Sequence, residues 1–194
     1  MSAGELKRAK RDVRRRVLAA RDAVSEEERE AAAAAVAARV LELPEVRGAR
    51  EVMAFSSFGS ELSMDPLIER LTDAGVTVGL PAIVDGDLEV RTYRPGDPTT
   101  TTSFGAEEPA GGAPIDPLAL DVVITPAVAF DRQGRRIGYG GGFYDRFFRR
   151  IRPDAVRIGV AAALQVLDED LPAGNFDLRV HLIVTPEETI RCAA

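Results

Sequence analysis

The chain has 194 residues, of which 45% are hydrophobic and 29% charged, as is typical of a globular domain large enough to bury a core. With 25 Lys and Arg residues against 31 Asp and Glu residues, the formal net charge is −6, which argues against general nucleic-acid binding. The single cysteine, Cys192, excludes an internal disulfide and fits a reducing cytoplasm. We also expect no membrane span and no signal peptide, because no apolar run approaches about 18 residues and no apolar segment follows the basic N-terminus.

The N-terminal part of the chain predicts two helices and a buried strand. Residues 5–22 form a basic stretch with a thin apolar stripe, which indicates the first helix. Ser25 followed by Glu28 is a capping box, so a second helix should run from there to about Leu43. Residues 51–56 then predict a short buried strand.

The rest of the sequence alternates strand and helix patterns. Asp65 and Pro66 are typical of an N-cap and a first helical position, so a helix should run to about Ala74. The segment 95–117, rich in Pro, Gly and Thr, predicts a long loop. Strands are predicted at 76–80, 88–93, 121–124, 156–160 and 181–184, and a further helix at 143–151. This alternation predicts an α/β fold: a single compact domain over residues 1–194, with a mostly parallel central sheet flanked by helices on both faces.

The segment 135–147 carries the strongest functional signal. It contains Gly138, Gly140, Gly141 and Gly142, whose missing side chains let backbone N–H groups approach an anion. Arg136 adds a fork-shaped donor suited to phosphate, and Asp145 adds a hard oxygen ligand for Mg²⁺. Phe143 and Tyr144 would supply an aromatic wall, and the predicted helix would direct its N-terminus at the bound anion.

This pattern is a phosphate cradle in our interpretation, although a glycine-rich turn between core elements is the simpler alternative. It is not a P-loop, because no Lys-Ser or Lys-Thr pair follows the glycines. It is not a dinucleotide-binding fingerprint either, because Phe143 stands where the third glycine belongs.

Other candidate residues are scattered along the chain. In the first helix, Lys10 and Arg14 are four residues apart and share a face that could close on polyphosphate, although a charge run alone favours a solvated face. Phe58 follows a strand end, and Glu108 lies in the long loop, where function is common. Asp177 alone is more often a turn or cap residue. His181, the only histidine, is expected to be structural.

Taken together, these segments resemble the 5-formyltetrahydrofolate cyclo-ligase family, also called methenyltetrahydrofolate synthetases, over residues 10–186. Residues 10–14 look like the family's ATP-holding N-terminal helix, and residues 105–109 are similar to its Gly-x-x-Glu-Pro loop. Residues 121–134 lead into the glycine-rich signature at 136–145, and Leu171-Pro172 with Asp177 resembles the closing segment.

The resemblance implies an ATP-dependent ligase. ATP phosphorylates the formyl oxygen of 5-formyltetrahydrofolate, N10 attacks the formyl carbon, and phosphate leaves as 5,10-methenyltetrahydrofolate forms; ADP is the other product. Catalysis is assigned to Arg136, Tyr144 and Asp145, and Mg²⁺ to Asp145 and Asp177. ATP binding is assigned to Lys10, Arg11, Arg14, Arg136, Ile137, Gly138, Tyr139, Gly140, Gly141, Gly142, Phe143 and Tyr144. Folate binding is assigned to Phe58, Glu61, Ser63, Glu108, Tyr139, Gly140, Gly141, Gly142 and Phe143.

One position departs from the family pattern. The family usually has an acidic residue that contacts folate where this chain has Ser63. Either Glu61 or a loop carboxylate takes that role, or folate is held more weakly.

Two rival functions remain at this level. A non-enzymatic module would bind folate, nucleotide or RNA without turnover, and only the basic first helix favours RNA. A sugar-phosphate isomerase or CoA-transferase-like enzyme would need a dedicated base, for which Glu108 is the candidate. We expect a cytoplasmic monomer whose partners are its two small-molecule substrates, ATP and 5-formyltetrahydrofolate, with no membrane or nucleic-acid partner.

Overall fold

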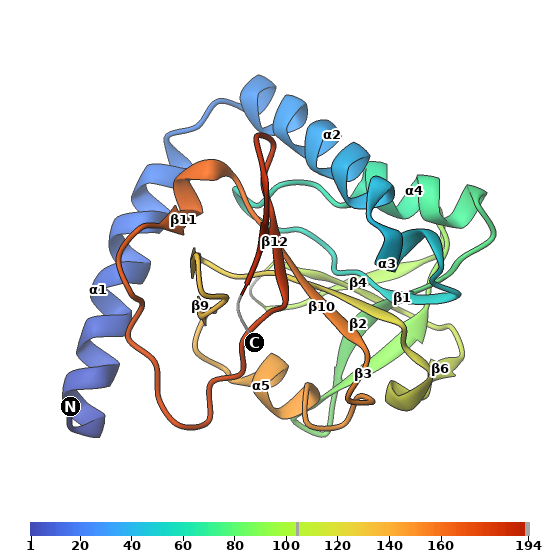
Figure 1. Cartoon of the computed structure of the whole chain (residues 1–194). Coiled ribbons are helices and arrows are strands. Elements are labelled where there is room, and N and C mark those ends of the chain that lie inside the picture. Colours follow the sequence, from blue (N-terminus) through green and yellow to red (C-terminus); the bar gives the residue numbers. More distant parts are fainter. Residues whose placement is uncertain (104, 193–194) are drawn as a thin grey trace.

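The computed structural model describes residues 1–103 and 105–192 and is built around one large sheet (Figure 1). The strand order is β13-β12-β10-β7-β1-β2-β3-β6. The parallel inner strands are β1 (Glu51–Met53), β2 (Thr77–Val84), β7 (Val122–Thr125), β10 (Val156–Val160) and β12 (Leu182–Val184). The antiparallel outer strands are β3 (Asp87–Thr92), β6 (Pro114–Ile115) and β13 (Thr189–Arg191). The expected parallel sheet is therefore confirmed for the centre, while its edges are antiparallel.

Helices cover both faces of this sheet, as expected. On one face lie α2 (Glu26–Glu42), α3 (Pro44–Arg47) and α4 (Asp65–Asp73), which share a buried cluster with the inner strands. On the other face lies α5 (Phe143–Phe147), whose Phe147 packs with Met53 and Val123. Figure 1 shows α2 and α4 above the sheet and α5 below it. The short helices η1 (Pro117–Ala119) and η2 (Ala163–Gln165) connect strands.

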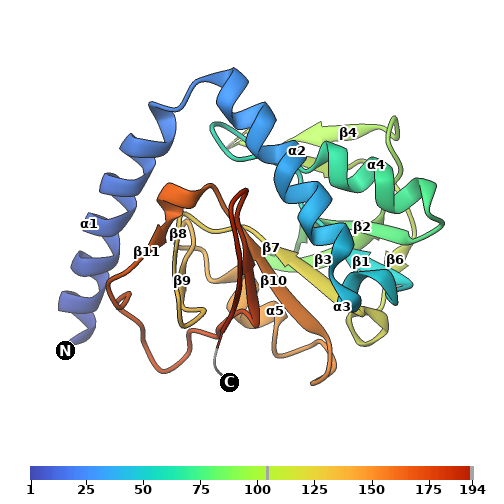
Figure 2. The same ribbon diagram turned by 45° about the horizontal axis from the view of Figure 1, so that its top comes forward.

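The first helix, α1 (Ala3–Asp22), stands apart from the large sheet (Figure 2). It packs on a small sheet of β11 (Val166–Leu167), β8 (Ala129–Asp131) and β9 (Arg136–Ile137). Its apolar contact is narrow: buried Val17, with partly buried Val13 and Leu18, meets a cluster from that sheet. A capping box at Ser2 starts the helix, and the predicted box at Ser25 starts α2.

Several local predictions were wrong. The segment predicted as a loop at 95–117 contains β6 and a hairpin of β4 (Thr99–Thr101) and β5 (Glu107–Pro109), and β5 lies against β2. Between β7 and the glycine-rich loop lies the β8–β9 hairpin, which the sequence patterns did not predict. Met64, not Asp65, is the N-cap of α4.

No described helix is long and apolar enough to cross a membrane.

The helix after the glycines is also shorter than predicted. It ends at Phe147, because tight bonds from Arg149 N to Arg146 O (3.2 Å) and Arg150 N to Phe147 O (2.8 Å) replace helical ones. This turn buries both Phe147 and Phe148. A helix of one turn has a weak dipole, so its N-terminus gives little support to anion binding. Anion binding at this place would depend on the backbone N–H groups of the loop.

Candidate active site

A cavity of about 920 Å³ opens where the parallel strands β1, β2 and β7 end. Phe55 follows β1 and Pro126 follows β7, and both line the cavity. Its other walls come from α1, the glycine-rich loop and the β2–β3 hairpin, where Ile83 and Leu88 face it. This is the usual ligand position in a parallel sheet, and the volume suits small-molecule substrates.

The glycine-rich loop forms one long wall of the cavity, from Arg136 to Asp145. Gly140 (φ +108°) and Gly142 (φ +66°) adopt backbone conformations that favour glycine. Gly141 has no such constraint, but a Cβ there would lie 2.6 Å from the ring of Phe143. The loop therefore needs glycine for two separate reasons, conformation and close approach.

Arg136 and Asp145, at the two ends of this loop, form a nearly buried ion pair. The Arg136 side chain is 5% exposed, and its Nη1 and Nη2 donate to Asp145 Oδ1 at 2.9 and 3.0 Å. The same oxygen accepts from Leu178 N at 3.0 Å, while Nη1 also donates to Leu178 O at 3.1 Å. The guanidinium carbon lies 4.8 Å from the ring centre of Phe148. The pair thus closes the loop and anchors segment 174–178 beside the cavity.

The α1 wall turns a basic face to the cavity, as the spacing of Lys10 and Arg14 predicted. Lys7, Lys10 and Arg14 all line it. Lys10 forms an ion pair with Asp177, and Arg14 Nε donates to Gly138 O at 2.6 Å. Burial lowers the pKa of Arg14, with Asp177 acting in the opposite direction. Lys10 and Arg14 are therefore partly buried and bonded rather than fully solvated, whereas Lys7 remains exposed at the cavity edge.

Another part of the lining is aromatic and acidic, and it includes the Tyr139 side chain of the glycine-rich loop. The rings of Phe58 and Tyr139 lie 5.0 Å apart. Tyr139 OH donates to Glu61 Oε1 at 2.7 Å, and Phe58 N donates to Glu61 Oε2 at 3.1 Å. Burial raises the pKa of the Glu61 carboxyl. Burial, together with the nearby Glu61, also raises the pKa of Tyr139, so its hydroxyl keeps its proton and can donate a hydrogen bond.

Tyr144 contributes a second phenol to the cavity. Its hydroxyl is buried and has no hydrogen-bond partner within residues 1–103 and 105–192. Burial raises its pKa, so it is neutral at physiological pH. A buried, unpaired donor in a cavity wall is costly unless a ligand satisfies it.

The sequence model of the 5-formyltetrahydrofolate cyclo-ligase family matches residues 6–186. The chain belongs to this family. The cyclo-ligase of Escherichia coli K12 is 36% identical over 174 residues, which cover 87% of this chain and 95% of the relative. The cyclo-ligase of Mycolicibacterium smegmatis is 34% identical over 149 residues, covering 73% and 76%.

Solved structures agree with the family assignment. The NMR structure of Aquifex aeolicus 5,10-methenyltetrahydrofolate synthetase matches with a TM-score of 0.84 and 29% identity, covering 95% of this chain and 93% of that one. The Mycoplasma pneumoniae 5,10-methenyltetrahydrofolate synthetase matches with a TM-score of 0.76 and 19% identity, which supports the fold alone. The family and fold expected from the sequence are therefore confirmed.

The carboxylates expected to hold Mg²⁺ both line the cavity, but each already has partners. Asp145 Oδ1 is bound to Arg136, and Asp177 Oδ2 meets Lys10 and accepts from Gly174 N at 2.7 Å. The described residues contain no group of three or more His, Cys, Asp or Glu able to hold a metal. The donor set therefore fits an ion that takes one or two carboxylates and fills its shell with phosphates and waters, as Mg²⁺ does, and not an all-protein cage.

Most of the expected site residues come together here, and two do not. Within the described chain the cavity lining includes neither Arg11 nor Ser63. Arg11 is exposed, because it is turned about 100° from Lys10 on the helix. Ser63 Oγ accepts from Asp65 N at 3.2 Å at the start of α4. Glu108 lines the cavity and accepts from Ile83 N at 3.2 Å.

Sequence reasoning missed Lys7 and the buried Arg21. Both could have been found, because Lys7, Arg14 and Arg21 are spaced seven residues apart and share one face of α1.

Proposed function

We propose that this chain catalyses the ATP-dependent cyclisation of 5-formyltetrahydrofolate to 5,10-methenyltetrahydrofolate, with release of ADP and phosphate. Family membership supports the reaction. The observation that carries it to this cavity is its mixed lining: the glycine-rich backbone and the cations of α1 lie in the same cavity as the aromatic and acidic side chains of Phe58, Tyr139 and Glu61. Such a cavity suits a polyphosphate beside a flat, hydrogen-bonding ring system.

The chemistry needs positioning and charge stabilisation rather than a protein nucleophile. The formyl oxygen attacks the γ-phosphorus, the bond to the β-phosphate oxygen breaks, and ADP leaves. N10 then attacks the activated formyl carbon and closes the ring, the N10 proton is lost to the departing phosphate or to water, and phosphate leaves with the former formyl oxygen. Lys10, Arg14 and the N–H groups of residues 138–142 would hold the phosphates in line and spread the developing charge.

Mg²⁺, when bound, would neutralise phosphate charge during the transfer. We assign it to Asp145 and Asp177 through the carboxylate oxygens that face neither Arg136 nor Lys10. Arg136 then has two tasks. It orients Asp145, and it adds positive charge to the phosphate wall, the part of the lining formed by Lys10, Arg14 and residues 138–142. Tyr144 would donate its unpaired hydroxyl hydrogen to a substrate oxygen.

At the folate end, we propose that Glu61 takes the role that the family usually gives to the position of Ser63. Its carboxylate oxygens can accept N–H donors of the pterin, and the rings of Phe58, Tyr139 and Phe143 would pack against the substrate's flat groups. Glu108, which also lines the cavity and accepts from Ile83 N, is the alternative loop carboxylate.

The test is spectroscopic, because 5,10-methenyltetrahydrofolate absorbs in the near ultraviolet. Purified protein with ATP, Mg²⁺ and 5-formyltetrahydrofolate should develop this absorbance, and ADP in place of ATP should not support it. Absence of the signal from folded protein would reject the enzyme and leave the binding module. Signal without ATP would exclude phosphoryl transfer.

The cytoplasmic location and monomeric state stay predictions. The first rests on the lone cysteine, and sedimentation at assay concentration tests the second. An RNA partner is disfavoured, because Lys10 and Arg14 face the cavity instead of solvent.

A further inference from the structure

Arg21 is the most deeply buried cation on α1, yet it does not line the cavity. It lies in the last turn of the helix and is 4% exposed. Its Nε donates to Ser60 Oγ at 2.9 Å and its Nη2 donates to Tyr139 OH at 3.0 Å. Burying a guanidinium is costly, so its contacts have to compensate for lost hydration. One of those contacts is with Tyr139, which together with Phe58 and Glu61 forms the part of the lining that we call the folate wall.

The contact with Tyr139 fixes the direction of a hydrogen-bond chain. A guanidinium only donates, so the Tyr139 oxygen must accept from Arg21. The phenol hydrogen is then free to point at Glu61 Oε1, 2.7 Å away. Arg21 therefore decides which way the Tyr139 hydroxyl points, and through it where the Glu61 carboxylate is held.

The guanidinium itself is held from its other side. Ser60 Oγ accepts from Arg21 and donates to Asp22, the neighbouring carboxylate on α1. Ser60 also adjoins Glu61 in sequence, so the loop that carries the acid is tied to the end of the helix twice. The fork geometry of arginine makes both contacts at once, which a lysine ammonium on a single stem would not reproduce.

The groups that face Glu61 come from four segments of the chain. Arg21 faces it from α1, Tyr139 and Tyr144 face it from the glycine-rich loop and α5, and the backbone N–H of Phe58 comes from its own loop. Burial raises the pKa of Glu61, while Tyr139, the Phe58 N–H and Arg21 act in the opposite direction. Removing Arg21 takes away the only positive charge in that set and moves the pKa of Glu61 further up.

We propose that Arg21 is a positioning residue for folate: acting through the Tyr139 hydroxyl, it holds the Glu61 carboxylate ready to accept from the pterin. This inference rests on the proposed function of the cavity. In this proposal the two ends of α1 serve different substrates. Lys10 and Arg14 contact the phosphates of ATP, and Arg21 supports the folate wall from behind.

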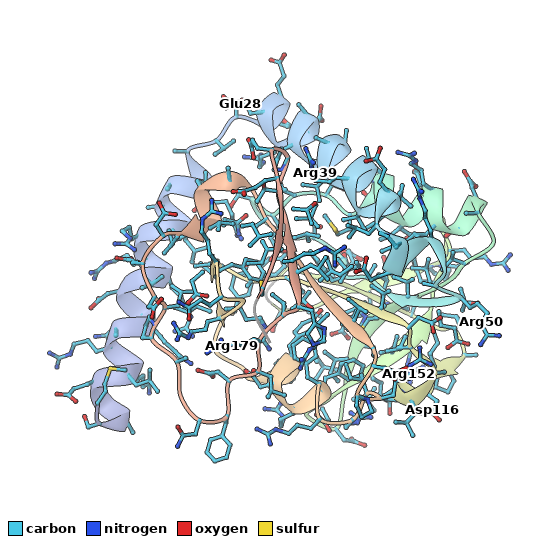
Figure 3. The ribbon with its side chains drawn as sticks, in the orientation of Figure 1. Glu28, Arg39, Arg50, Asp116, Arg152 and Arg179 are labelled. Atoms are coloured by element: carbon cyan, nitrogen blue, oxygen red, sulfur yellow. The ribbon has the colours of Figure 1, made fainter. Side chains whose placement is uncertain are left out.

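The experiment compares Arg21→Gln with two matched controls in the methenyl absorbance assay. Arg39→Gln removes another partly buried arginine, which ties α2 to the β12–β13 turn through Pro186 O (3.0 Å) and Glu187 O (3.1 Å); Figure 3 shows it at the top of the molecule. Arg15→Gln removes an arginine from α1 itself whose side chain is 78% exposed. Both controls should keep the folate KM and the pH profile of the wild type, whatever stability they lose.

Arg21→Gln should raise the KM for 5-formyltetrahydrofolate about tenfold, the usual loss of one buried charged hydrogen bond, and leave the KM for ATP nearly unchanged. The acid limb of kcat/KM for folate should move to higher pH, because the carboxylate form of Glu61 is lost earlier as pH falls. Arg21→Lys keeps the charge, so it should restore the pH limb while the KM stays raised.

Ser60→Ala keeps the test decisive if Arg21→Gln does not fold, because it loosens the guanidinium without removing a cavity residue. It should raise the folate KM in the same direction but by less. If both Ser60→Ala and Arg21→Lys match Arg15→Gln in folate KM, the inference is overturned and Arg21 is structural. Wild-type cyclisation in the same assay keeps this failure distinct from failure of the proposed function.

Discussion

Asp145→Asn separates two roles of one carboxylate. The Asp145 side chain is 23% exposed, and its Oδ1 accepts from both Nη atoms of Arg136 and from Leu178 N. Asparagine keeps a carbonyl oxygen for these donors but loses the charge, and charge-assisted bonds are about twice as strong as neutral ones. We therefore expect a loss of about 2 kcal/mol in the free energy of unfolding, less than the roughly 3–5 kcal/mol of a pair broken outright.

A metal role adds a second and separable effect. If Asp145 also holds Mg²⁺, kcat should fall on the order of 10²–10³-fold, with little change in the KM for folate. Denaturant unfolding and steady-state kinetics across a Mg²⁺ titration measure the two effects independently.

Asp121→Asn is the matched control for this experiment. Asp121 also accepts from an arginine, Arg152 Nη2 at 2.6 Å, and from the backbone N–H of Arg50 at 2.6 Å and of Glu51 at 3.0 Å. Figure 3 shows Arg50 and Arg152 on the side of the molecule away from α1. This variant should lose comparable stability and keep its kcat. A stable Asp145→Asn enzyme with near-normal kcat at saturating Mg²⁺ would refute the metal assignment and leave Asp145 as the anchor of Arg136.

Three further outcomes are expected. Arg14→Ala should weaken ATP binding in calorimetry by about tenfold or more, and Arg15→Ala should not, because only Arg14 bonds the loop. Gly141→Val should abolish nucleotide binding yet leave the melting curve intact, because it displaces the ring of Phe143 in an exposed loop. Burial lowers the pKa of His181, so stability should fall as pH drops below its unfolded pKa of about 6.5, and His181→Gln should flatten that dependence in denaturant titrations at several pH values.

The part of the cavity proposed to hold phosphate was predictable because one continuous segment supplies most of it. The glycines, Arg136 and Asp145 are neighbours in sequence, so their combination is visible before folding. The partners of Lys10 and Arg14 were not visible, but helical spacing alone placed the two side chains on one face. What sequence spacing cannot supply is contact between distant segments: Arg21 and Tyr139 are separated by 118 residues.

Glu61 and Ser63 illustrate a different limit. Both lie in an irregular segment, where no periodicity says which side chain faces inward. A bond from Glu61 N to Phe58 O (3.2 Å) turns the chain so that Glu61 enters the cavity, while Ser63 is used at the start of α4. The sequence left open whether Glu61 or a loop carboxylate replaces the acid at Ser63, and the turn geometry brings Glu61 into the cavity, where Glu108 also lies.

The strands missed by the sequence share a physical cause. The β8–β9 hairpin and the strands between residues 99 and 115 are two or three residues long, too short to show alternation. They form because larger elements surround them: β8 lies under α1, and β5 lies against β2. Their pairing is a consequence of tertiary packing and not of local propensity.

The position of α1 links these observations. Its apolar seam is limited to Val13, Val17 and Leu18, so much of what holds the helix in place is polar: Lys10 to Asp177, Arg14 to the glycine-rich loop, and Arg21 to Tyr139. Lys10 and Arg21 are separated by about 16 Å along a helix that rises about 1.5 Å per residue. In the proposed assignment, one rigid element therefore spans the phosphate-binding and folate-binding parts of the cavity. Because Lys10 and Arg14 both dock the helix and line the cavity, phosphate binding at these two side chains would be coupled to helix docking.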